Sequence, residues 1–185
     1  MARVAPIVRW AHAELKLGIS HRHGSKTNQQ GGAVRRASAK LQEVRVRNAK
    51  FEDAGSIAVL SGQLGYPCSA ATVRRRLRNL LANTDHAIWV AENNKGVAGW
   101  IHVFVYELLE SDRQAEIGGL VIDQNFRGQG AGKALVERAE RWAQARRLDS
   151  VYVRSNVIRK KAHAFYQKQG YKIDKTQHAF RKELR

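Results

Sequence analysis

The sequence predicts an α/β domain in which helices flank a mixed central sheet. Short apolar runs of strand length alternate with longer segments whose apolar residues recur at helical spacing. One of these runs, residues 120–122, leads into a glycine-rich loop and then into a long amphipathic stretch. The chain has 185 residues, of which 43% are hydrophobic. That length suits one domain with its own core.

The first elements are a strand and two helices. Residues 44–47 alternate apolar and basic side chains, as a half-exposed strand does. A helix is predicted from about Phe51, and Gly65-Tyr66-Pro67 ends it. Ser69 is placed to cap a second helix. This helix carries four arginines, which predict a solvated face or alternatively an anion site: Arg74, Arg75, Arg76 and Arg78.

A hairpin and a third helix follow. Residues 87–92 and 97–106 predict two strands, and the polar turn 93–96 between them favours a hairpin. Beyond the glycine loop, three apolar residues at helical spacing predict a buried helix face: Leu135, Ala139 and Trp142.

The glycine loop, residues 127–132 (RGQGAG), predicts an anion site. Glycines let the backbone approach an anion, and the amides of the first helical turn point toward it. A Walker A loop requires Ser or Thr after the Gly-Lys pair, but Ala134 follows Lys133. A dinucleotide fingerprint requires a third glycine at position 133 and an acidic residue that ends the next strand. Asp149 precedes that strand, so both assignments fail.

Four segments together resemble the GNAT superfamily of acyl-CoA-dependent N-acetyltransferases. The glycine loop matches the pattern Arg/Gln-x-x-Gly-x-Gly/Ala. Residues 116–123 (EIGGLVID) resemble the fourth strand of that family, and residues 151–156 (VYVRSN) resemble its fifth strand. Residues 162–171 (AHAFYQKQGY) resemble its following helix. The resemblance covers residues 42–185, and it implies about seven strands, about four helices and splayed central parallel strands.

The resemblance also implies how acetyl-CoA binds. The amides of Leu120, Val121 and Ile122 would face the pantetheine arm and the thioester. Gly118-Gly119 within that strand suits a bulge or a close backbone approach. The diphosphate would lie on Arg127, Gly128, Gln129, Gly130, Ala131, Gly132 and Lys133. Asn156 is a further candidate contact, but the family often places its asparagine where this chain has Arg159.

Tyr166 and Glu116 are the candidate catalytic residues. Tyr166 matches the family tyrosine near the CoA sulfur, where a phenol can protonate the leaving thiolate. The alternative is that Tyr166 only packs within its helix. Glu116 opens the strand beside the acceptor and is the candidate base, directly or through water; an exposed glutamate without this role is the alternative. His163 and His178 are other candidates for the base.

The predicted reaction is acetyl transfer to a primary amine of a small molecule, by direct attack in a ternary complex. The resemblance places the acidic segment 107–116 in a loop at the acceptor site, where it would attract an ammonium group. The alternative is a solvated loop without this role. A protein lysine or N-terminus is an alternative acceptor. A net charge of +17 leaves a non-catalytic CoA- or nucleic-acid-binding protein as an alternative of another class. The basic residues are spread along the chain, which argues against specific nucleic-acid binding. No metal is expected.

Residues 1–42 are predicted to be a basic N-terminal extension, and residues 43–185 the GNAT domain. The extension holds eight Lys or Arg and one Glu, and its second half has few apolar residues, so we expect disorder. We expect a cytoplasmic monomer or homodimer, with an organelle transit peptide as the alternative role of the extension. No apolar run approaches the ~20 residues of a membrane span. Cys68 is the single cysteine, which excludes an internal disulfide.

Overall fold

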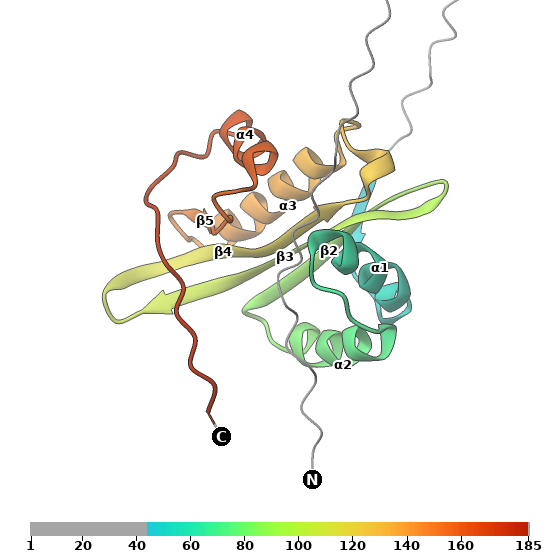
Figure 1. Cartoon of the computed structure of the whole chain (residues 1–185), viewed down its shortest axis with the longest axis horizontal. Helices are drawn as coiled ribbons and strands as arrows, with labels where there is room; N and C mark the ends of the chain where they lie inside the picture. The colour runs from blue at the N-terminus through green and yellow to red at the C-terminus, as the bar shows by residue number, and fades with distance from the viewer. Residues whose placement is uncertain (1–43, 185) are drawn as a thin grey trace, which may run out of the picture. The chain divides into compact units, whose positions relative to one another are not determined.

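The computed structural model describes residues 44–184 (Figure 1). The predicted extension, residues 1–42, lies outside the described residues. The described chain contains, in order, β1 (Arg45–Asn48), the short 3-10 helix η1 (Phe51–Asp53), α1 (Ala54–Leu64), α2 (Ala70–Leu81), β2 (His86–Asn93), β3 (Gly96–Leu108), β4 (Ser111–Ile122), the 3-10 helix η2 (Gln124–Phe126), α3 (Ala131–Ala145), β5 (Val151–Val153) and α4 (Lys160–Lys168).

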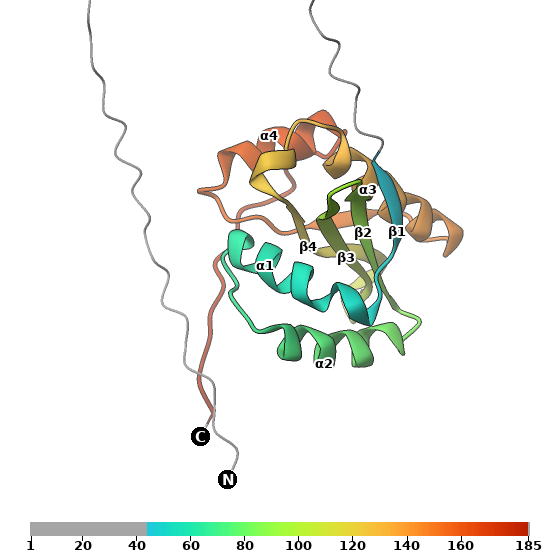
Figure 2. The same ribbon diagram turned by 90° about the vertical axis from the view of Figure 1, so that its right-hand side faces the viewer.

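The sheet is mixed, as predicted. Its strand order is β1-β2-β3-β4-β5, and the first four strands are antiparallel to their neighbours. Strand β5 alone runs parallel to its neighbour, β4. Helices α1 and α2 cover one face of the sheet, and α3 and α4 lie on the other side (Figures 1 and 2).

Each face of the sheet buries its own apolar cluster. The cluster under α3 centres on side chains that are fully buried: Ile101, Val103, Leu135, Val136 and Ala139. The cluster under α1 and α2 centres on Ile57, Val73, Leu77, Ile88 and Val90. The two clusters hold the helices on opposite sides of β3 and β4, so the long strands pass between two packed layers.

The helix boundaries follow from the predicted signals. The hydroxyl oxygen of Ser69 accepts a hydrogen bond from the Thr72 amide at 3.1 Å, and α2 begins there. Gly65 ends α1 with φ of 100°, in the left-handed region that favours glycine. Among residues 44–184, none of the helices combines the length and apolarity that crossing a bilayer requires.

The prediction of about seven strands was wrong. Within residues 44–184 the sheet has five strands and is flanked by four α-helices. Residues 172–184 follow α4 without regular secondary structure. Their large apolar side chains are exposed, at 71% for Ile173, 95% for Phe180 and 88% for Leu184. Strand β5 is only three residues long, and residues 172–184 bury few side chains. Pairing of this segment with the sheet would therefore gain little stability.

Candidate active site

Strands β4 and β5 pair over a short distance and then part. Within the described residues their ladder consists of Ala115 with Val151, Glu116 with Tyr152 and Ile117 with Val153. Strand β5 ends at that third pair, whereas β4 continues for five more residues to Ile122. The predicted ligand strand, Leu120 to Ile122, is therefore the part of β4 that lies beyond its parallel neighbour. On the β5 side, Leu120 to Ile122 have no strand partner within the described residues.

Gly118 forms the predicted bulge in β4. His102 of β3 pairs with Gly119 and Val103 pairs with Ile117, so Gly118 is the extra residue. A Cβ on Gly118 would lie 3.0 Å from the Phe104 ring, and one on Gly119 would lie 2.8 Å from the Trp100 indole. A side chain at Gly119 would force the Trp100 ring to move, and one at Gly118 would need the Phe104 ring to shift by a smaller amount.

The glycine loop has the conformation that an anion site needs. Gly128 and Gly130 have φ of 79° and 88°, which other residues rarely adopt. A Cβ on either would meet no atom of the described residues within 4 Å, so conformation rather than crowding selects glycine. Helix α3 begins directly after Gly130, and no side chain among residues 44–184 caps it. The amides of its first turn are thus available to an anion.

The other loop residues support this shape. Arg127 Nε donates to the Ile122 carbonyl at 3.2 Å, which ties the loop back to the end of β4. Gln129 is exposed and Ala131 is 2% exposed, so Ala131 anchors the start of α3 in the core. Gly132 lies close to Phe165 of α4, because a Cβ there would be 3.3 Å from the Phe165 ring. Lys133 is exposed and lies 3.7 Å from Glu137.

Tyr166 lies on α4 next to α3. Its ring contacts Phe165 and Tyr171, with centroids 5.2 and 5.5 Å apart. Burial raises the pKa of the Tyr166 phenol to about 12, and the charge of Arg159 acts in the opposite direction. The phenol is therefore protonated at neutral pH, as a proton donor must be.

Glu116 lies inside the sheet and is paired with Arg154. Glu116 is 4% exposed, and it pairs with Phe104 across the β3–β4 ladder. Arg154 donates from Nε and Nη2 to the two carboxylate oxygens, at 3.0 and 2.7 Å. This pair raises the pKa of Arg154. Any proton transfer to Glu116 must weaken one of these hydrogen bonds.

Asn156 and the two histidines make contacts close to them in sequence. The side-chain oxygen of Asn156 accepts from the Ile158 amide at 3.1 Å, and its carbonyl lies 3.0 Å from His163 Nε2. His178 is exposed beyond α4 and contacts Phe180. His163 thus contacts the segment that joins β5 to α4, and His178 contacts its own neighbour in the chain.

The acidic segment 107–116 is a hairpin and not a loop. Residues 109–110 form its turn, and Leu108 pairs with Ser111 across it. Arg113 lies 3.4 Å from Glu107 and 3.8 Å from Asp85, so part of the negative charge is neutralised. The sequence lacks a glycine or proline turn here, and the hairpin exists because β3 and β4 extend their pairing far beyond the core.

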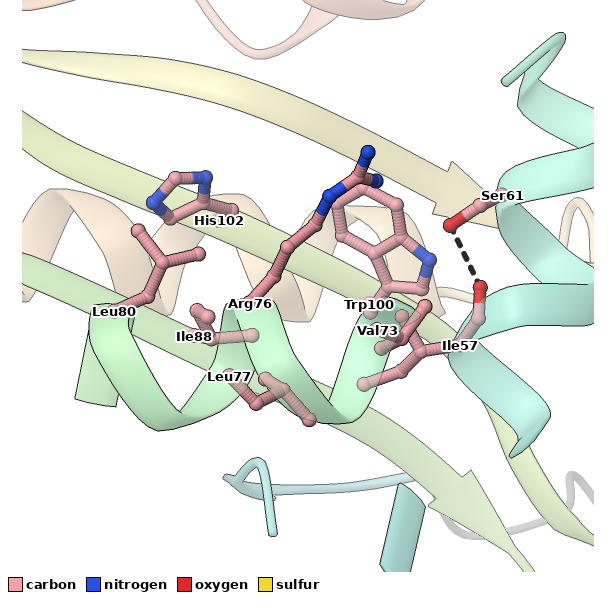
Figure 3. Close-up of a pocket in the computed structure, with 9 residues that line it drawn as sticks. All are labelled: Ile57, Ser61, Val73, Arg76, Leu77, Leu80, Ile88, Trp100 and His102. Carbon is pink, nitrogen blue, oxygen red and sulfur yellow. Dashed lines mark hydrogen bonds between the residues drawn. The ribbon is translucent and has the colours of Figure 1, made fainter. Parts of the chain in front are cut away.

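A cavity of about 180 Å³ lies between α1, α2 and the sheet. Its walls are mostly apolar, and they include Ile57, Val73, Leu77, Leu80 and Ile88. Figure 3 shows these side chains around the opening, with His102 and Leu80 at one end and Ser61 at the other. The cavity therefore adjoins the strand that carries the bulge partner, His102.

The polar groups of the cavity are few. Ser61 uses its hydroxyl to donate to the Ile57 carbonyl at 2.7 Å. Trp100 Nε1 is buried without a hydrogen-bond partner among the described residues. Arg76, an exposed residue of α2, lines the cavity together with Trp100 (Figure 3). His102 Nε2 lies 3.0 Å from His86 Nδ1.

Comparison with known proteins identifies the family. The model of the Acetyltransferase (GNAT) family matches residues 58–171, more than half of the chain. The matched range includes the parted strands, the glycine loop and Tyr166. The chain belongs to the GNAT family. It is an N-acetyltransferase that depends on acyl-CoA.

Individual relatives are distant in sequence. An uncharacterised N-acetyltransferase of Chlorobaculum tepidum is 28% identical over 127 residues, which are 69% of this chain and 74% of the relative. Glucosamine-6-phosphate N-acetyltransferase from Arabidopsis thaliana aligns with a TM-score of 0.66 and 21% identity, over 77% of this chain and all of that chain. AAC(6')-Iy in complex with a CoA bisubstrate analogue aligns with a TM-score of 0.69 and 14% identity, over 77% and 99%. These two structures share the GNAT fold with this chain.

Sequence reasoning missed four ring-bearing side chains that lie on one face of the sheet. Trp100, His102, Phe104 and Tyr106 alternate along β3, and they face the α1–α2 side of the sheet. The sequence did contain a signal for this face: the four residues occupy every second position, and alternate residues of a strand point to the same side of the sheet. In the part of the chain that the structure describes, no group of three or more His, Cys, Asp or Glu is placed to hold a metal ion.

Proposed function

We propose that the protein transfers the acetyl group of acetyl-CoA to a primary amine of a small molecule, by direct attack within a ternary complex. The parting of β4 and β5 beside the glycine loop carries this proposal. Leu120, Val121 and Ile122 lie on a stretch of β4 that has no strand partner on the β5 side within the described residues, and the glycine loop with the uncapped start of α3 follows in sequence. An acyl-CoA has the matching form, since a narrow arm joins a thioester to a diphosphate.

In this proposal the loop from Arg127 to Lys133 binds the diphosphate. The first-turn amides of α3 donate to it, and Lys133 and Arg127 add positive charge. The amides of Leu120 to Ile122 bind the pantetheine arm and polarise the thioester carbonyl. Asn156, which lies between β5 and α4, is proposed as a further contact to the arm.

Tyr166 is the proposed acid. The amine nitrogen forms a bond to the thioester carbon, the carbon–sulfur bond breaks, and the thiolate takes the phenol proton. Tyr166 then regains a proton from solvent. Arg159 favours this transfer because its positive charge lowers the pKa of Tyr166 against the effect of burial. Arg159 is held in place by a hydrogen bond of 2.6 Å from Nη2 to the Leu64 carbonyl.

Glu116 is the proposed base, and it acts through water. Both of its oxygens are already bound by Arg154, so a bridging water is the simpler acceptor for the amine proton. Glu116 points to the face of the sheet that carries the cavity, because it pairs with Phe104. The amine proton lost in the reaction leaves on this side, opposite the thiolate.

The test uses the full chain and separates binding from turnover. At 100 times its dissociation constant, acetyl-CoA should add about 2.7 kcal/mol to the free energy of unfolding. Thiol release is then measured with a panel of primary amines, with a lysine-containing peptide beside them. Tyr166→Phe should keep the stabilisation and lose about 10²- to 10⁴-fold in kcat. Unchanged kcat in Y166F would refute the acid role.

Other outcomes would replace the proposal. Thiol release with the peptide and with none of the small amines would make a protein the acceptor. Absence of stabilisation by acetyl-CoA, together with DNA binding that weakens steeply with salt, would favour the basic binder.

A further inference from the structure

The size of the cavity between α1, α2 and β3 limits what it can hold. Its volume is about 180 Å³. An engineered cavity of about 150 Å³ holds one benzene molecule, and pockets for drug-sized ligands begin near 300 Å³. The cavity therefore suits a body of one ring or a short branched chain. An amine made of several rings exceeds it.

Two of the polar side chains that line the cavity, Arg76 and Trp100, favour an anion. Arg76 contributes a guanidinium, which donates hydrogen bonds and accepts none. The Trp100 indole contributes an N–H that has no hydrogen-bond partner within residues 44–184. A buried donor without a partner costs free energy, and a ligand oxygen would remove that cost. Two donors, one of them charged, match a carboxylate and repel an ammonium group.

The cavity also adjoins the proposed site of acetyl transfer. Its wall includes Trp100 and His102, which press against the two glycines of β4. A Cβ on Gly118 would lie 3.4 Å from His102 Nδ1. A ligand anchored at the Arg76 side would therefore have its other end near the bulge, where β4 leaves β5.

We propose that this cavity binds the acceptor, and that the acceptor is a small amino acid with an apolar body whose carboxylate is bound by Arg76 and Trp100 Nε1. The proposal rests on the proposed function, because it specifies the amine of the same reaction. The apolar walls bury the body of the acceptor, and its amine lies toward Gly118. Acetylation there converts the amine to an amide and leaves the carboxylate unchanged.

The first experiment compares acceptors that differ only in the carboxylate. Thiol release from acetyl-CoA is measured with leucine and isoamylamine, and with phenylalanine and phenethylamine. Each amino acid should have a kcat/KM roughly 10- to 100-fold above that of its matched amine, since a charge-assisted hydrogen bond contributes that much. A multi-ring aminoglycoside should be a poorer acceptor than either amino acid.

Variants then test the two donors. Arg76→Gln should remove the advantage of leucine over isoamylamine, mainly through KM. Arg75→Gln is the matched control, because it removes the same charge from a neighbouring exposed position of α2 that does not line the cavity. Trp100→Phe should weaken leucine binding and keep the apolar wall. Isothermal titration of leucine into the CoA complex measures binding without turnover.

The outcomes separate this inference from the proposed function. Equal kcat/KM for each amino acid and its amine, with R76Q indistinguishable from R75Q, would overturn the inference and leave a small-amine acetyltransferase. If no small amine led to thiol release, both the inference and the proposed function would be overturned. Stabilisation by acetyl-CoA would still show whether the protein binds the acetyl donor. Loss of the leucine preference in R76Q alone would support the inference.

Discussion

His102 should make the stability of this protein depend on pH. The ring is partly buried on β3, and its Nε2 lies 3.0 Å from His86 Nδ1. The two rings also stack, with centroids 5.2 Å apart, and Phe104 packs against both. If both imidazoles were protonated, both of the facing nitrogens would carry hydrogen and neither could accept. Burial, together with the charge of His86, lowers the pKa of His102 from 6.5 to about 4.

The sign and size of the effect follow from linkage. The folded state disfavours the protonated His102 ring. The contribution of His102 to the free energy of unfolding is therefore fully present above pH 6.5 and is lost as the pH falls toward 4. A lowering of that size is worth about 3.4 kcal/mol, since each pKa unit corresponds to about 1.36 kcal/mol. Between pH 8 and pH 5 the free energy of unfolding should fall by about 2 kcal/mol on account of His102.

The assay is urea unfolding followed by tryptophan fluorescence at pH 8 and at pH 5. Other groups titrate in this range, so the quantity of interest is the difference between the wild type and His102→Phe. The phenylalanine ring keeps the stack with Phe104 and cannot be protonated. His178→Asn is the control, because it removes a histidine that is exposed. The wild type and H178N should lose the same free energy, and H102F should lose about 2 kcal/mol less.

One result would refute this reasoning. If H102F lost as much stability between pH 8 and pH 5 as the wild type, the protonated ring would have to be tolerated in the folded state. That tolerance would mean that the ring is solvated, and the apolar character of the neighbouring cavity would need revision.

Two further predictions concern stability and packing. Asp53 accepts three hydrogen bonds, two of them from an arginine, and is 6% exposed. Asp53→Ala should lower the free energy of unfolding by about 2–3 kcal/mol, which is somewhat less than the loss from breaking a fully buried ion pair. Glu52→Ala is the control at an exposed position, and an equal loss of stability in that variant would contradict the prediction. Gly119→Ala would place a Cβ 2.8 Å from the Trp100 indole and should cost about 1–3 kcal/mol. Gly62→Ala, on the exposed side of α1, should instead stabilise by about 0.5–1 kcal/mol, and urea unfolding at pH 7 compares the two.

Local signals in the sequence were sufficient for most elements. The cap at Ser69, the break at Gly65 and the turn at 93–96 act over a few residues, and the structure confirms each. The order of strand, glycine loop and helix was also local, and the positive φ of Gly128 and Gly130 confirms the predicted loop. The bulge at Gly118 was also predicted from a local signal, namely two adjacent glycines within an apolar strand.

Long-range pairing was beyond the reach of these signals. The acidic segment 107–116 was expected to be a loop, and the structure shows a hairpin, because the register of β3 against β4 continues past Tyr106. The count of seven strands came from family resemblance, and it was wrong because residues 172–184 make no strand in the structure. Whether a segment pairs depends on the edge available to it, which its own residues do not encode.

By itself, the sequence determined the family and the α/β class, since these depend on the order and spacing of short segments, and it predicted the residues of an acyl-CoA loop. Only the tertiary structure decided the surroundings of Glu116 and of the cavity. It paired Glu116 with Arg154, which is 38 residues away, and it placed Arg76 of α2 and Trp100 of β3 around the same cavity. These contacts join side chains from separate elements, and they form only when the helices pack on the sheet.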